Sequence, residues 1–272
     1  MQVAIYIGKR GAESEGRMEA MLSDLREGGC GLHFLSDGEK PAQDTDVLLS
    51  VGGDGTFLSA ASLVAGTGIP VLGVNTGRLG FLSENRPEDI SKALLSGDFT
   101  VESRAMLKAD VTSGSPEIDS WPYALNEIAV HRNGAAMLGV DVIIDGIQLP
   151  TYWADGLVIS TSSGSTAYSL SVGGPIVLPE SKVLIISPIA PHNLNVRPLV
   201  VPDTSEILLK MHSRDSRFVL TADNRTAEVS EDTEVKVAVA QFSLKRVRLN
   251  RSNFINALTE KLFWGEDIRN IR

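Results

Sequence analysis

The first hundred residues alternate between short apolar runs and segments with helical periodicity. Val3–Ile7 and Val47–Val51 are largely apolar runs of strand length. Between them, methionine and leucine residues recur every three or four positions, which predicts an amphipathic helix from Glu15 to Glu27. Helices that alternate with buried strands are typical of a mostly parallel sheet covered on its faces. We therefore expect a Rossmann-like α/β domain over residues 1–100.

The same alternation predicts the remaining elements of this domain. Leu32–Leu35 and Ile69–Val74 are the further predicted strands, and Phe57–Ala65 and Pro87–Leu95 are the further predicted helices. A proline followed by two acidic residues, as at the start of the last segment, is typical of a helix N-terminus.

After about Thr100 the pattern changes to alternation with period two, interrupted by turn pairs. Asp145-Gly146 lies between two such runs and predicts a hairpin. Residues 101–250 are therefore predicted to form a mostly-β sandwich domain, with strand candidates at Leu157–Thr161, Lys182–Ser187, Ile207–Met211, Phe218–Thr221 and Glu234–Val239. Apolar residues spaced by four predict an amphipathic helix over Ser252–Trp264, and we expect residues 251–272 to return to the N-terminal domain.

Composition narrows the classes of function. The 272 residues carry 25 Lys and Arg against 34 Asp and Glu, a net charge of −9 that argues against nucleic-acid binding. A single cysteine, Cys30, excludes an internal disulfide and indicates a reducing compartment. No apolar stretch approaches the ~18 residues of a membrane span, so we expect a cytoplasmic protein with no membrane partner.

A glycine-rich turn follows the Val47–Val51 run. Glycines at positions 52, 53 and 55 allow a phosphate to approach backbone N–H groups where a strand ends and a helix begins. Asp54 stands between them, where an acid is unfavourable unless it accepts a proton or holds a metal ion. The alternative is that Asp54 only caps the following helix.

Two other stretches are unusual. Between Ser160 and Ser171 nearly every residue is a hydroxyl residue, glycine or alanine, which fits a polyhydroxylated or phosphorylated ligand, or alternatively a solvated loop. The pair Asn126-Glu127 interrupts an apolar strand and must be hydrogen-bonded, either to neighbours or to a ligand.

Together these stretches resemble the NAD kinase family over nearly the whole chain. The segments that carry the resemblance are Gly52–Gly55 (GGDG), Asn75–Leu82 (NTGxLGFL), Asn126-Glu127, Asp155–Ser171 (the family's DG…TPTGSTAYSLS), Ser187–His192 and Arg197–Pro202. The chain departs from the family pattern at Ser162, where a proline is usual, and at Met137, Trp153 and Arg225. These departures leave open the preference between NAD and NADH.

The resemblance implies transfer of the γ-phosphoryl group of ATP to the 2′-hydroxyl of the adenosine ribose of NAD, which gives NADP. We expect Asp54 to accept the hydroxyl proton, Mg²⁺ to bridge the nucleotide phosphates, and Gly52, Gly53, Gly55 and Thr56 to bind the ATP phosphates. The implied NAD-binding residues are Asp54, Gly55, Phe81, Asn126, Glu127, Asp155, Ser163, Thr166, Ala167, Tyr168, Ser169, Leu170 and Ser171. Members of the family are usually homodimers or homotetramers, so we expect the NAD site to lie near a subunit interface.

Two other functions compete with this one. A lipid or sugar kinase shares the GGDG chemistry, and a sensor of NAD or NADP binds the dinucleotide without turnover. The four histidines show no metal-ligand spacing, so no metal site formed by dedicated protein ligands is expected. ATP, another nucleotide and polyphosphate all remain open as phosphoryl donors.

Overall fold

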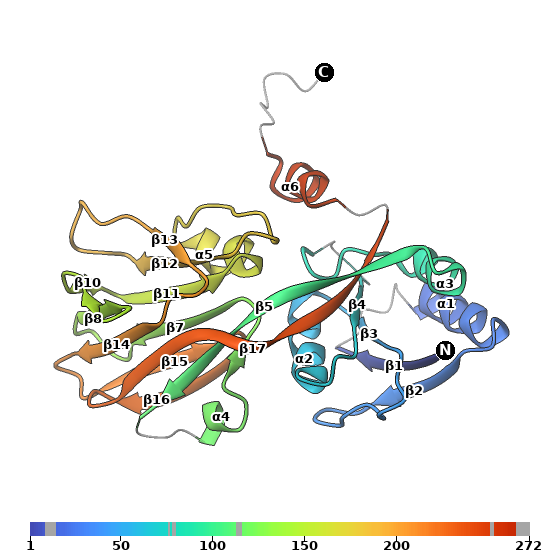
Figure 1. The fold of residues 1–272 in the computed structure, drawn as a ribbon, viewed down its shortest axis with the longest axis horizontal. Helices are drawn as coiled ribbons and strands as arrows, with labels where there is room; N and C mark the ends of the chain where they lie inside the picture. The colour runs from blue at the N-terminus through green and yellow to red at the C-terminus, as the bar shows by residue number, and fades with distance from the viewer. Residues whose placement is uncertain (9–14, 76, 78–79, 113–115, 251–252, 265–272) are drawn as a thin grey trace. The chain divides into compact units, whose positions relative to one another are not determined.

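The computed structural model describes residues 1–8, 15–75, 77, 80–112, 116–250 and 253–264 (Figure 1). The chain divides into two compact units. One, here called the α/β unit, comprises Met1–Ser103 and Leu244–Arg272. The other, the β unit, comprises Arg104–Ser243. The α/β unit is thus built from both ends of the chain.

The α/β unit contains a parallel sheet in the order β17-β4-β3-β1-β2. Its strands are β1 (Gln2–Ile7), β2 (Gly31–Leu35), β3 (Val47–Val51), β4 (Val71–Val74) and the last part of β17 (Glu234–Leu249). Its helices are α1 (Glu15–Glu27), α2 (Asp54–Val64), α3 (Pro87–Ser96) and α6 (Phe254–Leu262). The predicted Rossmann-like α/β fold is confirmed.

Helices cover both faces of this sheet. Apolar residues of α1 and α3 share a core with alternate residues of β1 and β3, such as Ile5 and Leu49. The intervening residues Ala4 and Leu48 are equally buried and point to the opposite face, against which α2 packs. Because both faces are covered, the central strands have no polar alternation, which is why the sequence shows them as largely apolar runs.

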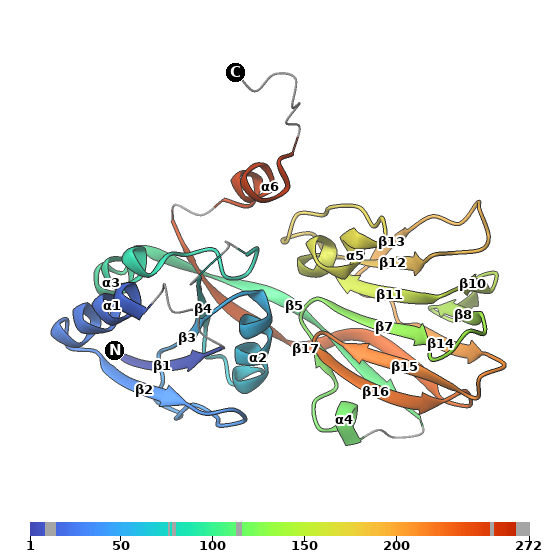
Figure 2. The same ribbon diagram turned by 180° about the vertical axis from the view of Figure 1, so that it is seen from behind.

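The β unit is a sandwich of two layers (Figure 2). One layer is an antiparallel sheet in the order β13-β12-β11-β7-β15-β16, and the other contains β10, β8, β14 and the first part of β17, with β5, β6 and β9. Phe218 and Leu220 of the first layer share a core with Leu209 and Val237 of the second. The predicted sandwich is therefore confirmed.

The strands of the β unit have the following bounds: β5 (Phe99–Val111), β6 (Tyr123–Ala124), β7 (Glu127–Arg132), β8 (Leu138–Ile144), β9 (Ile147–Gln148), β10 (Tyr152–Ala154), β11 (Gly156–Thr161), β12 (Val183–Ile189), β13 (Leu199–Pro202), β14 (Ile207–His212), β15 (Arg217–Ala222) and β16 (Arg225–Ser230). Strand β5 begins in the α/β unit. The predicted hairpin is present, because Asp145 and Gly146 have φ values of 50° and 83° and connect β8 to β9.

The predicted end of the last strand needs correction. Strand β17 continues ten residues beyond the predicted end at Val239, because buried residues such as Leu244 and Val247 extend its alternation to Leu249. The chain therefore returns to the α/β unit first through the end of β17 and then through α6. Ser252, the predicted start of that helix, lies outside the described residues.

The β unit also contains short helices that the sequence did not predict. They are α4 (Pro116–Asp119), the 3₁₀ helix η2 (Ser163–Thr166) and α5 (Tyr168–Ser171). The last two lie in the hydroxyl-rich stretch and are too short to produce helical periodicity. In the part of the chain that the structure describes, no helix is long and apolar enough to cross a membrane.

Phe218→Ala is expected to lower the free energy of unfolding by about 3–5 kcal/mol, because this fully buried side chain fills the sandwich core. The matched change Val200→Ala, on a side chain that is 43% exposed, should cost much less. Urea denaturation of both variants measures the difference. Equal midpoints would contradict the assignment of Phe218 to the core.

Candidate active site

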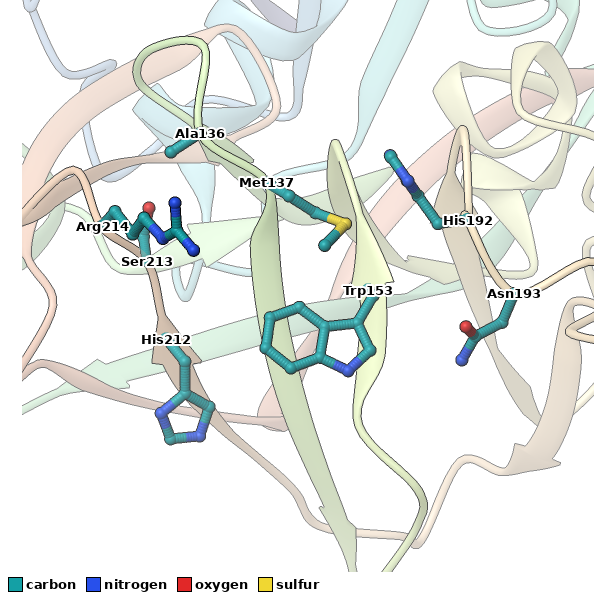
Figure 3. A pocket seen from close by; sticks show the side chains of 8 residues that line it. All are labelled: Ala136, Met137, Trp153, His192, Asn193, His212, Ser213 and Arg214. Atoms are coloured by element: carbon teal, nitrogen blue, oxygen red, sulfur yellow. The ribbon is translucent and has the colours of Figure 1, made fainter.

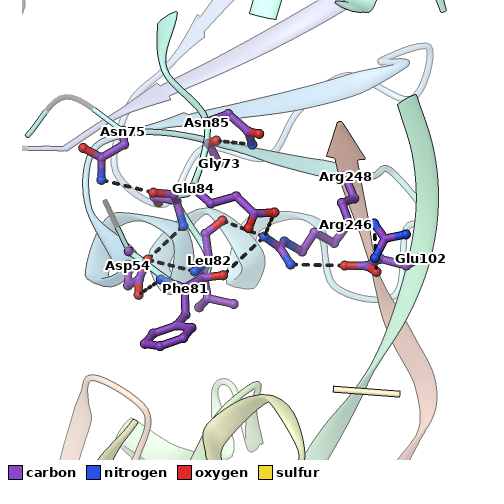
Figure 4. Close-up of polar contacts among 12 residues, drawn as sticks. Asp54, Gly73, Asn75, Phe81, Leu82, Glu84, Asn85, Glu102, Arg246 and Arg248 are labelled. Carbon is purple, nitrogen blue, oxygen red and sulfur yellow. Dashed lines mark hydrogen bonds and ion pairs between the residues drawn. The ribbon is translucent and has the colours of Figure 1, made fainter. Parts of the chain in front are cut away.

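Asp54 lies at the carboxyl end of β3, in the first turn of α2. Its Oδ2 accepts a hydrogen bond from the backbone N–H of Phe81 at 2.9 Å, and its Oδ1 accepts from Leu82 at 3.0 Å and Ser83 at 2.8 Å (Figure 4). The N-cap position belongs to Gly53, which has no capping side chain. The alternative that Asp54 only caps its own helix is therefore wrong: its carboxylate binds a different segment of the chain.

The N-terminus of α2 leaves backbone donors available. Its first intrahelical bond runs from Phe57 N–H to Gly53 O, so the N–H groups of residues 54–56 have no partner within the helix. Thr56 packs so closely on Gly8 and Gly52 that a Cβ atom at either glycine would overlap its side chain. A helix N-terminus without a capping side chain, reached through glycines, can bind an anionic group through its free backbone N–H groups.

The segment that Asp54 binds, residues 80–83, is also held through its carbonyl groups. Lys261 Nζ donates to the carbonyl of Gly80, and the guanidinium of Arg246 donates to those of residues 81 and 82 at 3.3 Å. Asn75 Nδ2 donates to the carbonyl of Ser83 at 3.1 Å. The N–H and carbonyl sides of this backbone segment are therefore both fixed by side chains, of which Asp54, Arg246 and Lys261 are distant in sequence.

Arg246 is almost fully buried, with a side chain only 5% exposed. It forms ion pairs with Glu84 at 2.6 Å and Glu102 at 3.1 Å (Figure 4). A buried guanidinium requires such partners, because an unpaired charge in the interior is strongly destabilising. No local pattern predicts this arrangement, since Arg246 lies within an ordinary alternating strand.

Phe81, one of the implied NAD-binding residues, is half-buried in the α/β unit. Its ring centroid lies 6.1 Å from that of Phe254 and 4.8 Å from Lys261 Nζ. A Cβ atom at Gly80, the residue before Phe81, would overlap the Asp54 carboxylate. A glycine is therefore required here for the backbone to approach that carboxylate closely. Within the predicted Asn75–Leu82 motif, residues 76, 78 and 79 lie outside the described part of the chain.

In the β unit, Asn126 and Glu127 are buried at the start of β7, and Asp223 binds their backbone. Its carboxylate accepts the N–H groups of Leu125 at 2.7 Å, Asn126 at 2.8 Å and Glu127 at 3.2 Å. Burial raises the pKa of Asp223, while these three bonds and the nearby Arg225 oppose the rise. The sequence predicted that Asn126 and Glu127 must be hydrogen-bonded to neighbours or to a ligand, and Asp223 is the neighbour that binds their backbone N–H groups.

Glu127 has a strongly perturbed carboxyl group. Burial, with the Asp223 charge as a second cause, raises its pKa to about 8, and a hydrogen bond from the Tyr168 backbone opposes the rise. Its Oε2 is buried without a hydrogen-bond partner among the described residues. At pH 7 this carboxyl is mostly protonated, so it can donate as well as accept a hydrogen bond.

Several hydroxyls of the Ser160–Ser171 stretch bind the protein itself. Thr161 Oγ1 donates to Leu125 O at 2.7 Å, Ser165 Oγ donates to Val177 O at 3.1 Å, and Ser169 Oγ lies 3.4 Å from Ser187 Oγ. The alternative of a solvated loop is therefore wrong. Of the implied NAD-binding residues here, Ser169 is buried, Ser171 is exposed, and Ser163, Thr166, Ala167, Tyr168 and Leu170 are half-buried.

Asp155 and Tyr168 each have a defined partner in the β unit. Asp155 lies between β10 and β11 and forms an ion pair with Arg132 Nε at 2.8 Å. The Tyr168 ring stacks on His131 with a centroid separation of 5.7 Å. Burial lowers the pKa of His131 and favours its neutral form. Both predicted residues are therefore ordered by contacts within the unit.

The residues that depart from the family pattern have separate surroundings. Met137 and Trp153 line a cavity of about 760 Å³ together with His192 and Arg214 (Figure 3). Arg225 instead donates to the backbone carbonyls of residues 121 and 123, so it supports the fold next to Asp223. No group of three His, Cys, Asp or Glu side chains in the described ranges is arranged to hold a metal ion.

Comparison with known proteins identifies the family. Residues 35–96 match the ATP-NAD kinase N-terminal domain, and residues 125–249 match the ATP-NAD kinase C-terminal domain. An NAD kinase of Porphyromonas gingivalis is 39% identical over an alignment of 290 positions, which covers 98% of this chain and 99% of that protein. The chain belongs to the NAD kinase family. An NAD kinase of Flavobacterium psychrophilum is 44% identical over 83% of this chain and 78% of its own length.

Solved structures of the NAD kinase family have the same fold. Yeast NADH kinase complexed with NADH matches with a TM-score of 0.85 and 26% identity, over all of this chain and 90% of that one. An NAD kinase from Archaeoglobus fulgidus in complex with ATP matches with a TM-score of 0.77 and 26% identity, over 92% of this chain and 95% of that one.

Three residues beside the NAD kinase motifs were missed from the sequence: Asp223, Arg246 and Lys261. Asp223 had a local signal, because Asp223-Asn224 separates two runs of period-two alternation and forms the turn between β15 and β16, with φ of 52° at Asp223. For Arg246 and Lys261 the partners lie more than 140 positions away, and no local pattern indicates them.

Gly80→Ala is expected to lower the free energy of unfolding by about 1–3 kcal/mol, because the added Cβ overlaps the hydrogen-bonded Asp54 carboxylate. The control Gly77→Ala meets no atom within 4 Å and should cost less. Thermal denaturation compares the two variants. An equal loss in both would show that the contact with Asp54 is not tight.

Glu127→Gln tests the raised pKa of Glu127. A folded-state pKa of about 8, above the ordinary 4.5, means that the folded protein binds this proton more tightly. Its stabilising contribution is complete below pH 4.5 and is lost as pH rises to 8, by at most about 1.4 kcal/mol per unit. Urea denaturation from pH 5 to 8 should show the ligand-free wild type losing stability relative to Glu127→Gln. Parallel profiles would contradict the shift.

Proposed function

We propose that this chain is an NAD kinase that transfers the γ-phosphoryl group of ATP to the 2′-hydroxyl of the adenosine ribose of NAD. The family membership supports the reaction. The observation that carries the assignment to residues is the Asp54 carboxylate, fixed at the carboxyl end of β3 beside the uncapped N-terminus of α2. The first turn of α2 therefore holds both a proton acceptor, the Asp54 carboxylate, and the backbone N–H groups that can donate to phosphate oxygens.

Asp54 is proposed as the group that accepts the hydroxyl proton. A carboxylate offers about four lone-pair sites, two on each oxygen. Oδ1 accepts two N–H groups and Oδ2 only one, so the remaining lone pair lies on Oδ2. In the proposed step the 2′-oxygen bonds to the γ-phosphorus, the bond from that phosphorus to the β-phosphate oxygen breaks, ADP leaves, and the proton passes to Oδ2.

Gly53, Gly55 and Thr56 are proposed to bind the ATP phosphates through backbone donors at the N-terminus of α2. The expectation that Gly52 also donates is wrong, because its N–H donates to the carbonyl of Val74 at 2.9 Å; its proposed part is close approach of the backbone alone. Backbone N–H groups supply the donors, and the helix dipole favours the negative charge. We propose that Mg²⁺, or another divalent cation, arrives with ATP as part of the substrate and neutralises its phosphate oxygens.

NAD is proposed to bind through the residues that the resemblance to the NAD kinase family implies. Asn126 and Glu127 would hydrogen-bond ribose hydroxyls, and the protonated Glu127 can both donate and accept. The proposed contacts with the rest of the dinucleotide are Asp54, Gly55, Phe81, Asp155, Ser163, Thr166, Ala167, Tyr168, Ser169, Leu170 and Ser171. Tyr168 and Glu127 are already adjacent through the Tyr168 backbone N–H.

We also propose that the protein is a homodimer or homotetramer with its NAD site near the subunit interface. Large apolar side chains exposed on the β unit support this, among them Trp153 at 39%, Ile147 at 72% and Leu194 at 88%. Light scattering of the purified protein tests the oligomeric state. A cytoplasmic location remains a prediction from the sequence.

Asp54→Asn tests the reaction and the base together. The wild type should form NADP from ATP, Mg²⁺ and NAD, read through an NADP-specific dehydrogenase. The variant should lose about 100-fold or more in kcat, because the amide cannot take the proton. Asp89→Asn is the matched control, since Asp89 is an exposed aspartate in the first turn of α3.

The outcomes separate the candidate functions. Near-normal turnover by a folded Asp54→Asn protein would exclude Asp54 as the base. NAD binding by the wild type without NADP formation would favour a sensor or another phosphoryl donor. Thermal denaturation of each variant shows whether it is folded, since the single carbonyl oxygen of an asparagine cannot accept all three backbone N–H groups.

A further inference from the structure

Lys261, in the last turn of α6, is a charged group that the proposed mechanism does not use. Its Nζ donates to the carbonyl of Gly80 and lies 4.8 Å from the centroid of the Phe81 ring. At the other end of the helix, Phe254 packs 6.1 Å from the same ring. Both contacts hold α6 against the residues that bind Asp54.

One peptide unit connects Lys261 to Asp54. The carbonyl of Gly80, which accepts from Lys261, and the N–H of Phe81, which donates to Asp54 Oδ2 at 2.9 Å, belong to the same peptide bond. A cation bound to the oxygen of an amide polarises it and strengthens the hydrogen bond that its N–H donates. Oδ2 is also the oxygen with the remaining lone pair. Lys261 is therefore one peptide unit away from the proposed proton acceptor.

Lys261 is half-buried, so its ammonium group is partly removed from water. Burial lowers its pKa, and Arg246 acts in the same direction, whereas the carboxylates of Glu84, Asp54 and Glu260 oppose the lowering. The stability of α6 does not require a half-buried lysine in its last turn, because a fully exposed lysine would interact equally well with the helix dipole. Taking the ammonium group partly out of water costs free energy, and a lysine that served only the helix could avoid this cost by staying exposed.

We propose that Lys261 is a positioning residue for phosphoryl transfer, which holds the Gly80–Phe81 peptide and through it orients Asp54 Oδ2 toward the acceptor hydroxyl. This inference rests on the proposed NAD kinase function. It predicts a larger effect on turnover than on substrate affinity, because Lys261 is not itself a proposed nucleotide contact and acts through the orientation of Asp54 Oδ2. An error of orientation at a reacting group lowers the rate of the chemical step.

Lys261→Met is the decisive variant. Methionine keeps an unbranched side chain and the helix propensity of α6, and it removes the ammonium group that lies over the Phe81 ring and binds the Gly80 carbonyl. We expect kcat for NADP formation to fall about tenfold or more, with the KM values for NAD and ATP within about twofold of the wild type. Lys261→Arg, which restores a cationic donor, should recover most of the loss. Lys92→Met, an exposed lysine on α3, is the matched control and should behave as the wild type.

Each outcome decides the inference. An unchanged kcat in Lys261→Met, a loss that appears in KM instead, or an equal loss in the Met and Arg variants would overturn it. If the Met variant has a lowered Tm, Lys261→Gln replaces it, because glutamine is neutral and polar and should show the same loss of kcat. A wild type that forms no NADP would overturn the proposed function itself, whereas an active wild type with an equally active Met variant would overturn only the role of Lys261.

Discussion

The binding of three consecutive backbone N–H groups by one aspartate is the interaction on which the candidate site depends. Asp54 could not reach residues 81–83 unless position 80 lacked a side chain, and the 80–83 segment could not keep its shape with only one side satisfied. Arg246, Lys261 and Asn75 bind the carbonyl side of the same segment. A hydrogen bond with a charged partner contributes about 1.5–3 kcal/mol, so the whole set fixes Asp54 firmly.

The β unit uses the same arrangement in a different context. Asp223, in a hairpin turn, binds the N–H groups of residues 125–127 and so fixes the backbone of Asn126 and Glu127. The two aspartates differ in surroundings: Asp54 is half-buried, whereas Asp223 lies deep enough for burial to raise its pKa and that of Glu127. Asp54 is thus proposed to do chemistry while bound, whereas the charge of Asp223 adds to burial in raising the pKa of Glu127 and so favours the protonated carboxyl.

The sequence predicted those features that depend on local periodicity or on a contiguous motif. The strands and helices of the first hundred residues, the Asp145-Gly146 hairpin and the position of Asp54 after a buried strand followed from apolar spacing and glycine placement. Contacts between distant positions did not follow. Nothing near Arg246 or Lys261 in sequence indicates that both bind the 80–83 segment. The hydroxyl-rich stretch was predicted to face a ligand or water, yet Thr161, Ser165 and Ser169 bind the protein interior, because composition alone does not give direction.

The path of the chain has a consequence for the order in which the protein forms on the ribosome. Residues 104–243 form an uninterrupted unit, so the β unit can complete its sandwich once these residues have emerged, before the residues that follow it are added to the α/β unit. The α/β unit, although it contains the N-terminus, lacks one strand of its sheet until the second half of β17 emerges. Arg246 and Lys261 belong to that late segment. The nascent chain therefore carries Asp54 from early on but acquires the groups that fix its binding segment only after the whole β unit has been synthesised.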